Sequence, residues 1–343
     1  MTRTVLVTGV ARHIGARVAS VLASDPGISR VIGVDTVPPP TPARDGGPAP
    51  GGVPLGRTEF VRVDLRSPDI AQVIAAADID TVVHVDLMSA PRALMKEHNV
   101  IGTMQLLGAC QRSPLIRRVV VRSTTEVYGS SARDPAVFTE DAEPPETPSH
   151  GFAKDAVEVE GYVRGFARRR PDVTVTTLRF ADFMGPGVDS PLTRYFGRPV
   201  LPTVLGFDPR LQFVHVDDGV EVLRRVTMED RPGTFNVAGD GVLLLSQCVR
   251  RAGRPTMPLP SPAFGVLGEL AGRVGLADFS PEQIRLMCHG RAVDTTRLAD
   301  ELGWKPKFTT AAAFDDFLRS LGRDADGGPL AALIGRIEEE FGR

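Results

Sequence analysis

Six short apolar runs, rich in β-branched residues, alternate with helix-like segments along the first half of the chain. The runs are TVLVT (4–8), RVIGVD (30–35), EFVRVD (59–64), DTVVHV (80–85), RRVVVRST (117–124) and VTVTTLRF (173–180). They are almost continuously apolar, which is typical of parallel strands covered on both faces. Helix-like segments lie between them, among others at 13–24, 91–112 and 152–169. This repetition predicts a Rossmann-type α/β fold, a doubly wound parallel sheet with right-handed crossovers.

The pattern loosens after residue 181, which predicts a smaller, mostly helical C-terminal substrate lobe beside the sheet. LQFVHVDDGVEVLRRV (211–226) predicts a short strand, an aspartate N-cap and a helix, and GTFNVAG (233–239) predicts one more strand. We therefore expect the sheet domain to comprise 1–181 and 206–238, and the lobe to comprise 182–205 and 239–322. The tail 323–343 is expected to form an amphipathic terminal helix.

Residues 36–56, TVPPPTPARDGGPAPGGVPLG, interrupt the alternation directly after the second strand. More than half of them are proline or glycine, so a regular element is not expected there. We expect a flexible surface loop, either a solvated insertion or a segment that covers a nucleotide bound beyond the strand ends.

Composition excludes several classes of partner and site. The net charge is −2, and the one dense basic run, RGFARRRP (164–171), is typical of a helix C-terminus, so neither a nucleic acid nor a membrane surface is expected as a partner. The three cysteines have no CxxC spacing and the six histidines are scattered, so no metal is expected. No charged leader precedes the first strand and no run reaches membrane-spanning length, which predicts a cytoplasmic protein.

The first strand leads into a glycine turn and a helix, in the run VLVTGVARHIGARVASVL (5–22). Asp35 follows about twenty residues later, at the end of the second strand. This is the layout of a dinucleotide site, in which helix N–H groups meet the pyrophosphate and a carboxylate meets the ribose hydroxyls. Because an acid at Asp35 repels a 2′-phosphate, NAD is expected in preference to NADP.

At these residues the chain resembles the extended short-chain dehydrogenase/reductase family, of the NAD-dependent epimerase/dehydratase type. TGVARHIG (8–15) is similar to the family fingerprint TGxxGxxG, and further motifs follow in the family's order. They are DLRSP (64–68), HNVIGTMQLL (98–107), STTEVYG (123–129), LRFADFMGPG (178–187), FVHVDD (213–218), TFNVAG (234–239) and ELGWKP (301–306). The resemblance covers nearly the whole chain and implies an NAD-linked epimerase or oxidoreductase acting on a nucleotide sugar.

The resemblance also implies a set of cofactor-binding residues from the glycine turn, the second strand, the adenine side and the active-site helix. These are Gly9, Arg12, His13, Ile14, Gly15, Asp35, Asp64, Leu65, Val85 and Lys154.

Two departures fall on this cofactor site. Arg12 replaces the middle glycine of the fingerprint, and Asp86 and Leu87 replace small residues that follow VxH in the family. Two interpretations are open. Arg12 supplies a guanidinium to the pyrophosphate, or Arg12 and Asp86 pair and occupy the space that the pyrophosphate needs. The retained glycines, Asp35 and Asp64 favour weak NAD binding over its loss.

The family's catalytic tyrosine is missing. Lys154 matches the lysine of the family, but four residues before it stands His150. Thr124 matches the hydroxyl that binds the reacting oxygen, and Tyr128 falls at a position that is structural in the family. His150 is therefore the candidate proton-transfer group, because an imidazole titrates near neutral pH, with a polar first-turn residue as its alternative role.

Substrate contacts are expected from Asp86, Glu126, Asp182, Arg210 and His215, which follow strand ends or flank the second half's strand–helix unit. STTEVYG is also similar to the S-T-D-E-V-Y-G run of sugar-nucleotide 4,6-dehydratases. Thr125 replaces the aspartate that protonates the leaving hydroxyl, and a threonine hydroxyl is too weak an acid for that step.

Two functions remain open from the sequence. One is an NAD-linked epimerase or oxidoreductase in which Thr124 orients the substrate, Lys154 holds the ribose and His150 or a water moves the proton. The other is a non-catalytic nucleotide-binding sensor or scaffold on the same fold. The resemblance further implies a homodimer formed through 91–112 and 152–169.

Overall fold

The computed structural model describes residues 3–40, 53–87, 95–143, 147–148, 151–260 and 280–322. His150, most of the proline- and glycine-rich loop (41–52) and the tail 323–343 lie outside the described residues, so the predictions made for them stay predictions. Residues 36–40 and 53–56 at the two ends of that loop form no helix or strand.

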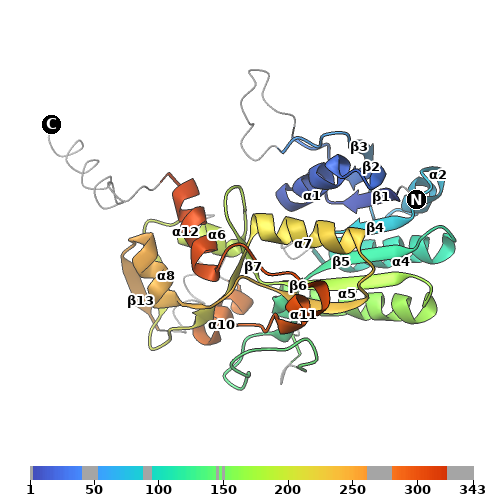
Figure 1. Ribbon diagram of the computed structural model, residues 1–343. Helices are drawn as coiled ribbons and strands as arrows, with labels where there is room; N and C mark the ends of the chain where they lie inside the picture. The colour runs from blue at the N-terminus through green and yellow to red at the C-terminus, as the bar shows by residue number, and fades with distance from the viewer. Residues whose placement is uncertain are drawn as a thin grey trace.

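A seven-stranded parallel sheet forms the centre of the larger unit (Figure 1). Its order is β11-β6-β5-β4-β1-β2-β3, so the chain starts in the middle, runs to one edge and then builds the other half. The strands are β1 (Arg3–Thr8), β2 (Ile28–Asp35), β3 (Glu59–Arg62), β4 (Thr81–His84), β5 (Arg118–Thr124), β6 (Thr174–Phe180) and β11 (Gly233–Val237). The predicted doubly wound Rossmann-type sheet is thereby confirmed.

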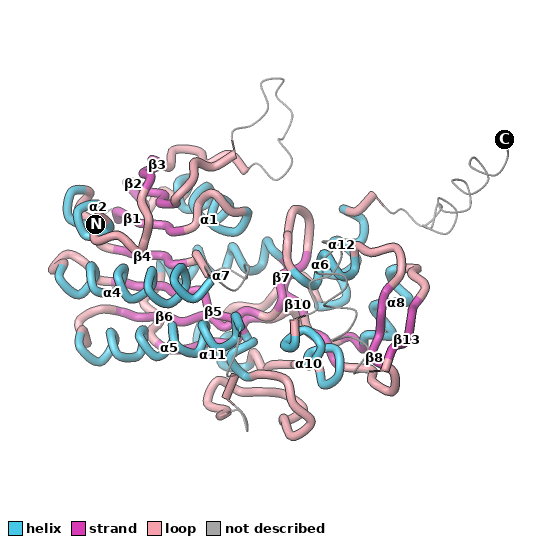
Figure 2. The backbone as a smooth tube through the Cα atoms, turned by 180° about the vertical axis from the view of Figure 1, so that it is seen from behind, coloured by secondary structure: helices cyan, strands magenta, loops and turns pink. Residues whose placement is uncertain are grey.

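Helices cover both faces of this sheet. On one face α1 (His13–Ser24) and α7 (Val216–Met228) pack together and share a core with β1, where α11 (Thr296–Leu302) also contributes buried leucines. On the other face lie α2 (Ile70–Ala76), α4 (Gly102–Arg112) and α5 (Gly151–Arg169), of which α4 and α5 are seen in Figure 2. Continuous apolar strands are thus explained by two buried faces.

The smaller lobe lies at the far end of the molecule in Figure 1 and has its own core. Its helices are α6 (Pro191–Phe196), α8 (Leu245–Ala252), α10 (Pro281–His289) and α12 (Thr310–Ser320). Its short strands pair as β7 (Asp182–Met184) with β10 (Phe213–His215), β8 (Leu201–Val204) with β13 (Thr256–Leu259), and β9 (Arg210–Leu211) with β12 (Leu243–Leu244). The predicted mostly helical lobe is therefore present. Two of the strands paired beside it, β9 and β10, lie within 206–238, which we expected in the sheet domain.

Two short helical turns shape the edge of the sheet where ligands bind in this architecture. A π-helical turn, η1 (Glu97–Ile101), leads into α4, and a 3₁₀ turn, η2 (Thr125–Tyr128), directly follows β5. Among the described residues, no helix combines the length and the apolar character that a membrane crossing requires.

One local prediction was wrong. The N-cap of α7 is His215 and not an aspartate, because the imidazole Nδ1 accepts the Asp217 N–H at 3.2 Å. Asp217 and Asp218 lie instead in the first turn, where their charge favours the helix N-terminus.

Candidate functional site

The glycine turn connects β1 to α1 at the carboxyl edge of the sheet, beside the point where the strand order reverses. Gly9 has φ +74°, and a Cβ on Gly15 would lie 2.1 Å from the Gly9 carbonyl oxygen. Both glycines are therefore required, the first for the turn and the second for close packing of the helix. Arg12 is the N-cap of α1 and makes no capping hydrogen bond, and Ile14 packs on the core.

His13 begins α1 and faces the segment after β7. Its ring packs on Gly187, where a Cβ would lie 2.6 Å from the imidazole Cε1. Both ring nitrogens are buried and make no hydrogen bond among the described residues. Burial lowers the pKa of His13, and Arg17 lowers it further, so the ring is a neutral packing surface between the turn and the small lobe.

Asp35 is the last residue of β2 and bonds to the backbone of the turn. Its carboxylate is buried and accepts the Ala11 N–H at 2.9 Å and the Thr36 N–H at 2.7 Å. The acid is thereby held at the end of β2, beside the turn, as the sequence predicts for a ribose-binding carboxylate.

Asp64 and Leu65 follow β3 on the expected adenine side. Arg66 binds both Asp64 carboxylate oxygens, and its hydrogen bond lowers the pKa of this acid despite partial burial. Leu65 is buried in the core that the sheet forms with α2, α4 and α5. Asp64 is thus ionised, with part of its surface open to solvent.

Arg12 and Asp86 form the ion pair that the sequence raised as one possibility. The Arg12 Nη1 lies 3.2 Å from the Asp86 Oδ1, and His98 Nε2 lies 2.8 Å from the Asp86 Oδ2. Asp86 is buried, which raises its pKa, but the His98 hydrogen bond and the Arg12 charge outweigh this and lower it. The His98 contribution was not anticipated, because His98 lies twelve residues further along the chain.

A chain of hydrogen bonds fixes the end of β4 against β1 and α4. The Thr8 hydroxyl accepts the backbone N–H groups of residues 85–86, so its hydrogen points to His84 Nδ1 at 2.9 Å. His84 Nε2 then carries the proton and donates to Thr103, whose hydroxyl donates to the Asn99 carbonyl. Burial lowers the pKa of His84 to about 4, which keeps this neutral arrangement at physiological pH.

Arg122 is a functional candidate that the sequence reasoning missed. It lies on β5 two residues before Thr124, and therefore on the same face of the strand. Its Nη1 donates to the carbonyls of Val85 and Leu87 at 3.3 Å each, and its guanidinium lies 5.3 Å from the centre of the Phe183 ring. Burial lowers the pKa of Arg122 to about 10. A charged residue in a run of valines was the only available signal.

Thr124 ends β5 and caps η2. Its hydroxyl oxygen accepts the Glu126 N–H at 3.2 Å, so the hydroxyl hydrogen stays available for another acceptor. Lys154 lies in the first turn of α5, is 43% exposed, and has its Nζ 3.7 Å from Glu158 Oε1. Tyr128 is buried, donates to Asn236 and accepts from Arg179, which agrees with the structural role expected from its position.

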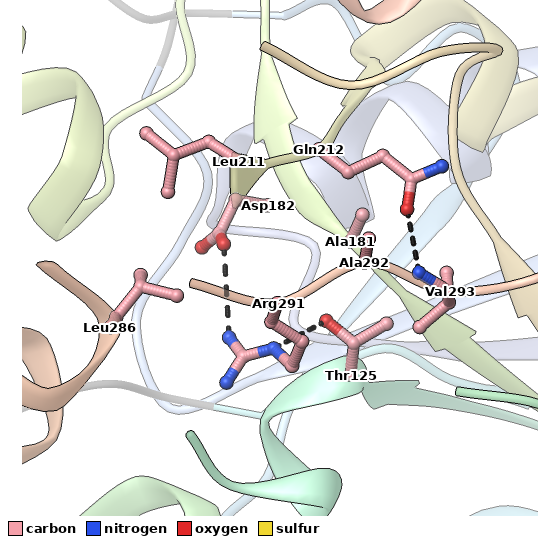
Figure 3. Close-up of a pocket in the computed structure, with 9 residues that line it drawn as sticks. All are labelled: Thr125, Ala181, Asp182, Leu211, Gln212, Leu286, Arg291, Ala292 and Val293. Atoms are coloured by element: carbon pink, nitrogen blue, oxygen red, sulfur yellow. Dashed lines mark hydrogen bonds and ion pairs between the residues drawn. The ribbon is translucent and has the colours of Figure 1, made fainter. Parts of the chain in front are cut away.

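Asp182 at the start of β7 faces Arg291, which lies in the segment after α10 (Figure 3). Asp182 lies 3.9 Å from the Arg291 Nη2, and Arg291 Nε donates to the Thr125 hydroxyl at 3.2 Å. Burial raises the pKa of Glu126 to about 7, with Asp182 adding to the rise against the opposing charge of Arg291. Burial likewise raises the pKa of Asp182. Glu126 and Asp182 are therefore brought into one electrostatic cluster.

Arg291 was missed by the sequence reasoning. Its side chain is 7% exposed, and it also donates to the Gly129 carbonyl at 3.1 Å. Together with the exposed Arg210 it lines a neighbouring cavity, which Ser131, Asp134 and His289 also line. Arg210 therefore lies where an anionic group of a ligand would find a second guanidinium.

His215 does not fit the predicted substrate contact. Besides capping α7, its Nε2 lies 3.1 Å from the Asp316 carboxylate, and its ring stacks on Phe308 at 3.7 Å between centres. Both nitrogens are engaged and the residue is buried, so the structure gives His215 a structural role that joins α7 to α12.

The residues of the turn fit a dinucleotide. The first turn of α1 contains no acidic residue, and its N-cap residue Arg12 makes no capping hydrogen bond, so these N–H donors and the half-exposed Arg12 are suited to a diphosphate. Asp35 lies at the end of β2 beside this turn, and Asp64 follows β3. Among the described residues, no group of three or more potential protein ligands could hold a metal ion.

Comparison with known proteins gives one family. The model of the NAD dependent epimerase/dehydratase family matches residues 5–238. An uncharacterized protein of Mycobacterium tuberculosis (strain H37Rv) is 47% identical over 327 residues, which cover 93% of this chain and 84% of that protein. A dTDP-glucose 4,6-dehydratase of Mycolicibacterium smegmatis is 25% identical over 313 residues, 89% of this chain and 88% of the enzyme.

Among solved structures, the UDP-glucuronic acid 4-epimerase of Bacillus cereus, in complex with UDP-glucuronic acid and NAD, has a TM-score of 0.71. It is 19% identical, and the match covers 93% of this chain and 99% of the epimerase. At this identity the likeness shows the fold.

Proposed function

Because the chain belongs to the NAD-dependent epimerase/dehydratase family, we propose that it binds NAD at the carboxyl edge of the sheet and acts on a nucleotide sugar or a similar hydroxylated substrate. NAD bound there would be the electron acceptor when a substrate alcohol is oxidised. The adenosine half would be held by Asp35 and Asp64, and the diphosphate by the first turn of α1 and Arg12.

The observation that carries the proposal is the position of Glu126 in η2, two residues after Thr124, where loss of solvation raises the pKa of its carboxyl to about 7. A carboxyl group with a pKa of about 7 can both accept and return a proton at neutral pH. Thr124 has a free hydroxyl hydrogen to donate to the reacting substrate oxygen, because its own oxygen is used by the Glu126 N–H. Glu126 is therefore the proton-transfer group that we propose in place of the missing tyrosine.

His150 and Lys154 remain part of the proposal. His150, four residues before Lys154, is the second candidate for proton transfer, and Lys154 would hold the nicotinamide ribose from the first turn of α5. The proposal ranks Glu126 first because its pKa is raised to about 7, under the electrostatic influence of Asp182 and Arg291.

The substrate class follows from the guanidinium groups of the small lobe. Arg210 and Arg291 line one cavity, and planar guanidinium groups suit the phosphates of a nucleoside diphosphate. The Bacillus cereus epimerase, which holds UDP-glucuronic acid, supports this class. We do not propose 4,6-dehydration, because Thr125 is too weak an acid and its hydroxyl already accepts from Arg291.

The test combines NAD binding with turnover. Calorimetric titration with NAD is followed by incubation with NAD and UDP-glucose, UDP-glucuronic acid or dTDP-glucose, and products are identified by mass spectrometry. We expect binding, turnover of one sugar nucleotide, and loss of turnover by roughly 100-fold or more in Glu126→Gln and Thr124→Val. Asp141→Asn, at a fully solvated acid, serves as the control and keeps the wild-type rate.

Three results would contradict the proposed function or one of its parts. No NAD binding at millimolar concentration removes the cofactor proposal, and unchanged turnover in Glu126→Gln with loss in His150→Ala transfers the proton role to His150. NAD binding without turnover of any sugar nucleotide favours the non-catalytic nucleotide-binding protein, which the Arg12–Asp86 pair and the missing tyrosine suggest.

A further inference from the structure

Asp86 places a carboxylate directly on the glycine turn. It follows β4, its side chain is 3% exposed, and a Cβ added to Gly9 would lie 2.9 Å from the Asp86 Cβ and 3.1 Å from its Oδ1. The space above the Cα of Gly9 is thus taken by an acidic side chain. Gly9 opens the turn, and Arg12, three residues later, stands at the position where the backbone of a dinucleotide turn approaches the diphosphate.

Among the described residues, one oxygen of this carboxylate lacks a hydrogen-bond donor. His98 lies at hydrogen-bond distance from Oδ2, but Oδ1 is buried and receives no aligned hydrogen bond from any residue that the structure describes. Its contact with Arg12, at 3.2 Å, is a charge contact without aligned geometry. An acid that served to orient Arg12 would accept aligned N–H groups from its guanidinium.

The same turn offers the groups that a diphosphate needs. Arg12 precedes the uncapped first turn of α1, and no acidic residue of that turn competes for its N–H groups. Asp86 is therefore an internal anion at an anion-binding position, and it shares Arg12 with any ligand that binds there.

We propose that Asp86 competes with the dinucleotide diphosphate for Arg12 and the glycine turn, so that NAD is an exchangeable co-substrate and not a permanently held cofactor. The inference rests on the proposed function, since it concerns the affinity of the same site. Exchange suits a net oxidation or reduction, in which the dinucleotide leaves in a changed redox state.

The experiment measures affinity, not activity. NAD and ADP-ribose are titrated calorimetrically, at fixed ionic strength, into wild type, Asp86→Asn and Glu97→Gln. Asp86→Asn keeps the side-chain shape and removes the charge. Glu97→Gln removes one charge from η1, one residue before His98, at a side chain that is 61% exposed and paired with Arg66, so it is the matched control.

We expect Asp86→Asn to bind both ligands about tenfold or more tightly than wild type, because a neighbouring like charge is removed from a partly buried site. Glu97→Gln should bind as wild type does. Arg12→Gln should weaken binding more in the Asp86→Asn background than in wild type, because Arg12 is then fully committed to the diphosphate. After desalting, wild type should carry no dinucleotide and Asp86→Asn should retain some.

Weaker or unchanged binding in Asp86→Asn, relative to Glu97→Gln, overturns the inference and leaves the proposed function standing, provided that wild type binds NAD. Absence of binding in wild type and in all folded variants, with unchanged melting curves, overturns both. If wild-type protein retains dinucleotide through desalting, the inference that NAD is exchangeable is contradicted, whereas the proposed function is not.

Discussion

The Arg291 guanidinium lies 3.9 Å from the Asp182 carboxylate and donates to the Thr125 hydroxyl, so one side chain joins β7, η2 and the segment after α10 (Figure 3). It is 7% exposed, and its charge is the strongest influence that lowers the pKa of Glu126. The contact ties the small lobe to the end of β5, and it limits how far the pKa of Glu126 rises.

Arg291→Met should destabilise the protein by roughly 2 kcal/mol or more, because it leaves Asp182 without its cation and the Gly129 carbonyl without a donor in a buried site. Urea unfolding at neutral pH measures this loss. Arg30→Ala removes an arginine from a solvated surface pair with Glu59 and should change the stability little. Equal losses in the two variants would contradict the prediction.

The raised pKa of Glu126 predicts a pH dependence of stability. Its folded pKa of about 7 lies above the ordinary value of 4.5, so its contribution is fully present below pH 4.5 and is lost as the pH rises through 7. Glu126→Gln cannot ionise and should therefore melt at a higher temperature than wild type at about pH 8, and at a similar temperature at about pH 5.

Thermal unfolding of both proteins across this pH range measures the difference, with Asp141→Asn as the solvated control. A gap between wild type and Glu126→Gln that does not change with pH would show that the carboxyl has an ordinary pKa.

Gly15 and Gly108 give a matched pair of glycine substitutions in helices. A Cβ on Gly15 would lie 2.1 Å from the Gly9 carbonyl oxygen, whereas the nearest atom to a Cβ on Gly108 is 3.7 Å away, at the end of an arginine side chain. Gly15→Ala should destabilise the turn and remove NAD binding. Gly108→Ala should be neutral or stabilise α4 by up to about 1 kcal/mol. Melting curves and NAD titration measure both; retained NAD affinity in Gly15→Ala would be inconsistent with the packing.

His215 caps α7 and contacts Asp316, which predicts a structural role for this residue. His215→Ala removes the cap of α7 and the contact with Asp316, and should cost roughly 1–2 kcal/mol of stability without changing ligand affinity. His215→Asn keeps an N-cap acceptor and should lose less. Chemical unfolding and NAD titration separate the two effects, and a loss of affinity with unchanged stability would restore the substrate role.

Much of the cofactor side was predictable because it depends on local chain geometry. The glycine turn, Asp35 at the end of β2 and the alternation of strands and helices are encoded within short windows, and the predicted family relationship is confirmed by the match over 5–238. The possible pairing of Arg12 with Asp86 was also foreseen, since adjacent parallel strands end at the same edge.

The sequence by itself determined the doubly wound sheet, the glycine turn between β1 and α1, and the absence of a tyrosine four residues before Lys154. Only the tertiary structure decided that His98 joins Asp86, that Arg291 meets Asp182 and Thr125, and that Glu126 has a pKa near 7. These facts depend on burial and on contacts between segments far apart in the chain. Burial shifts a pKa through the loss of solvating water, and no local pattern of residues records how much water packing removes.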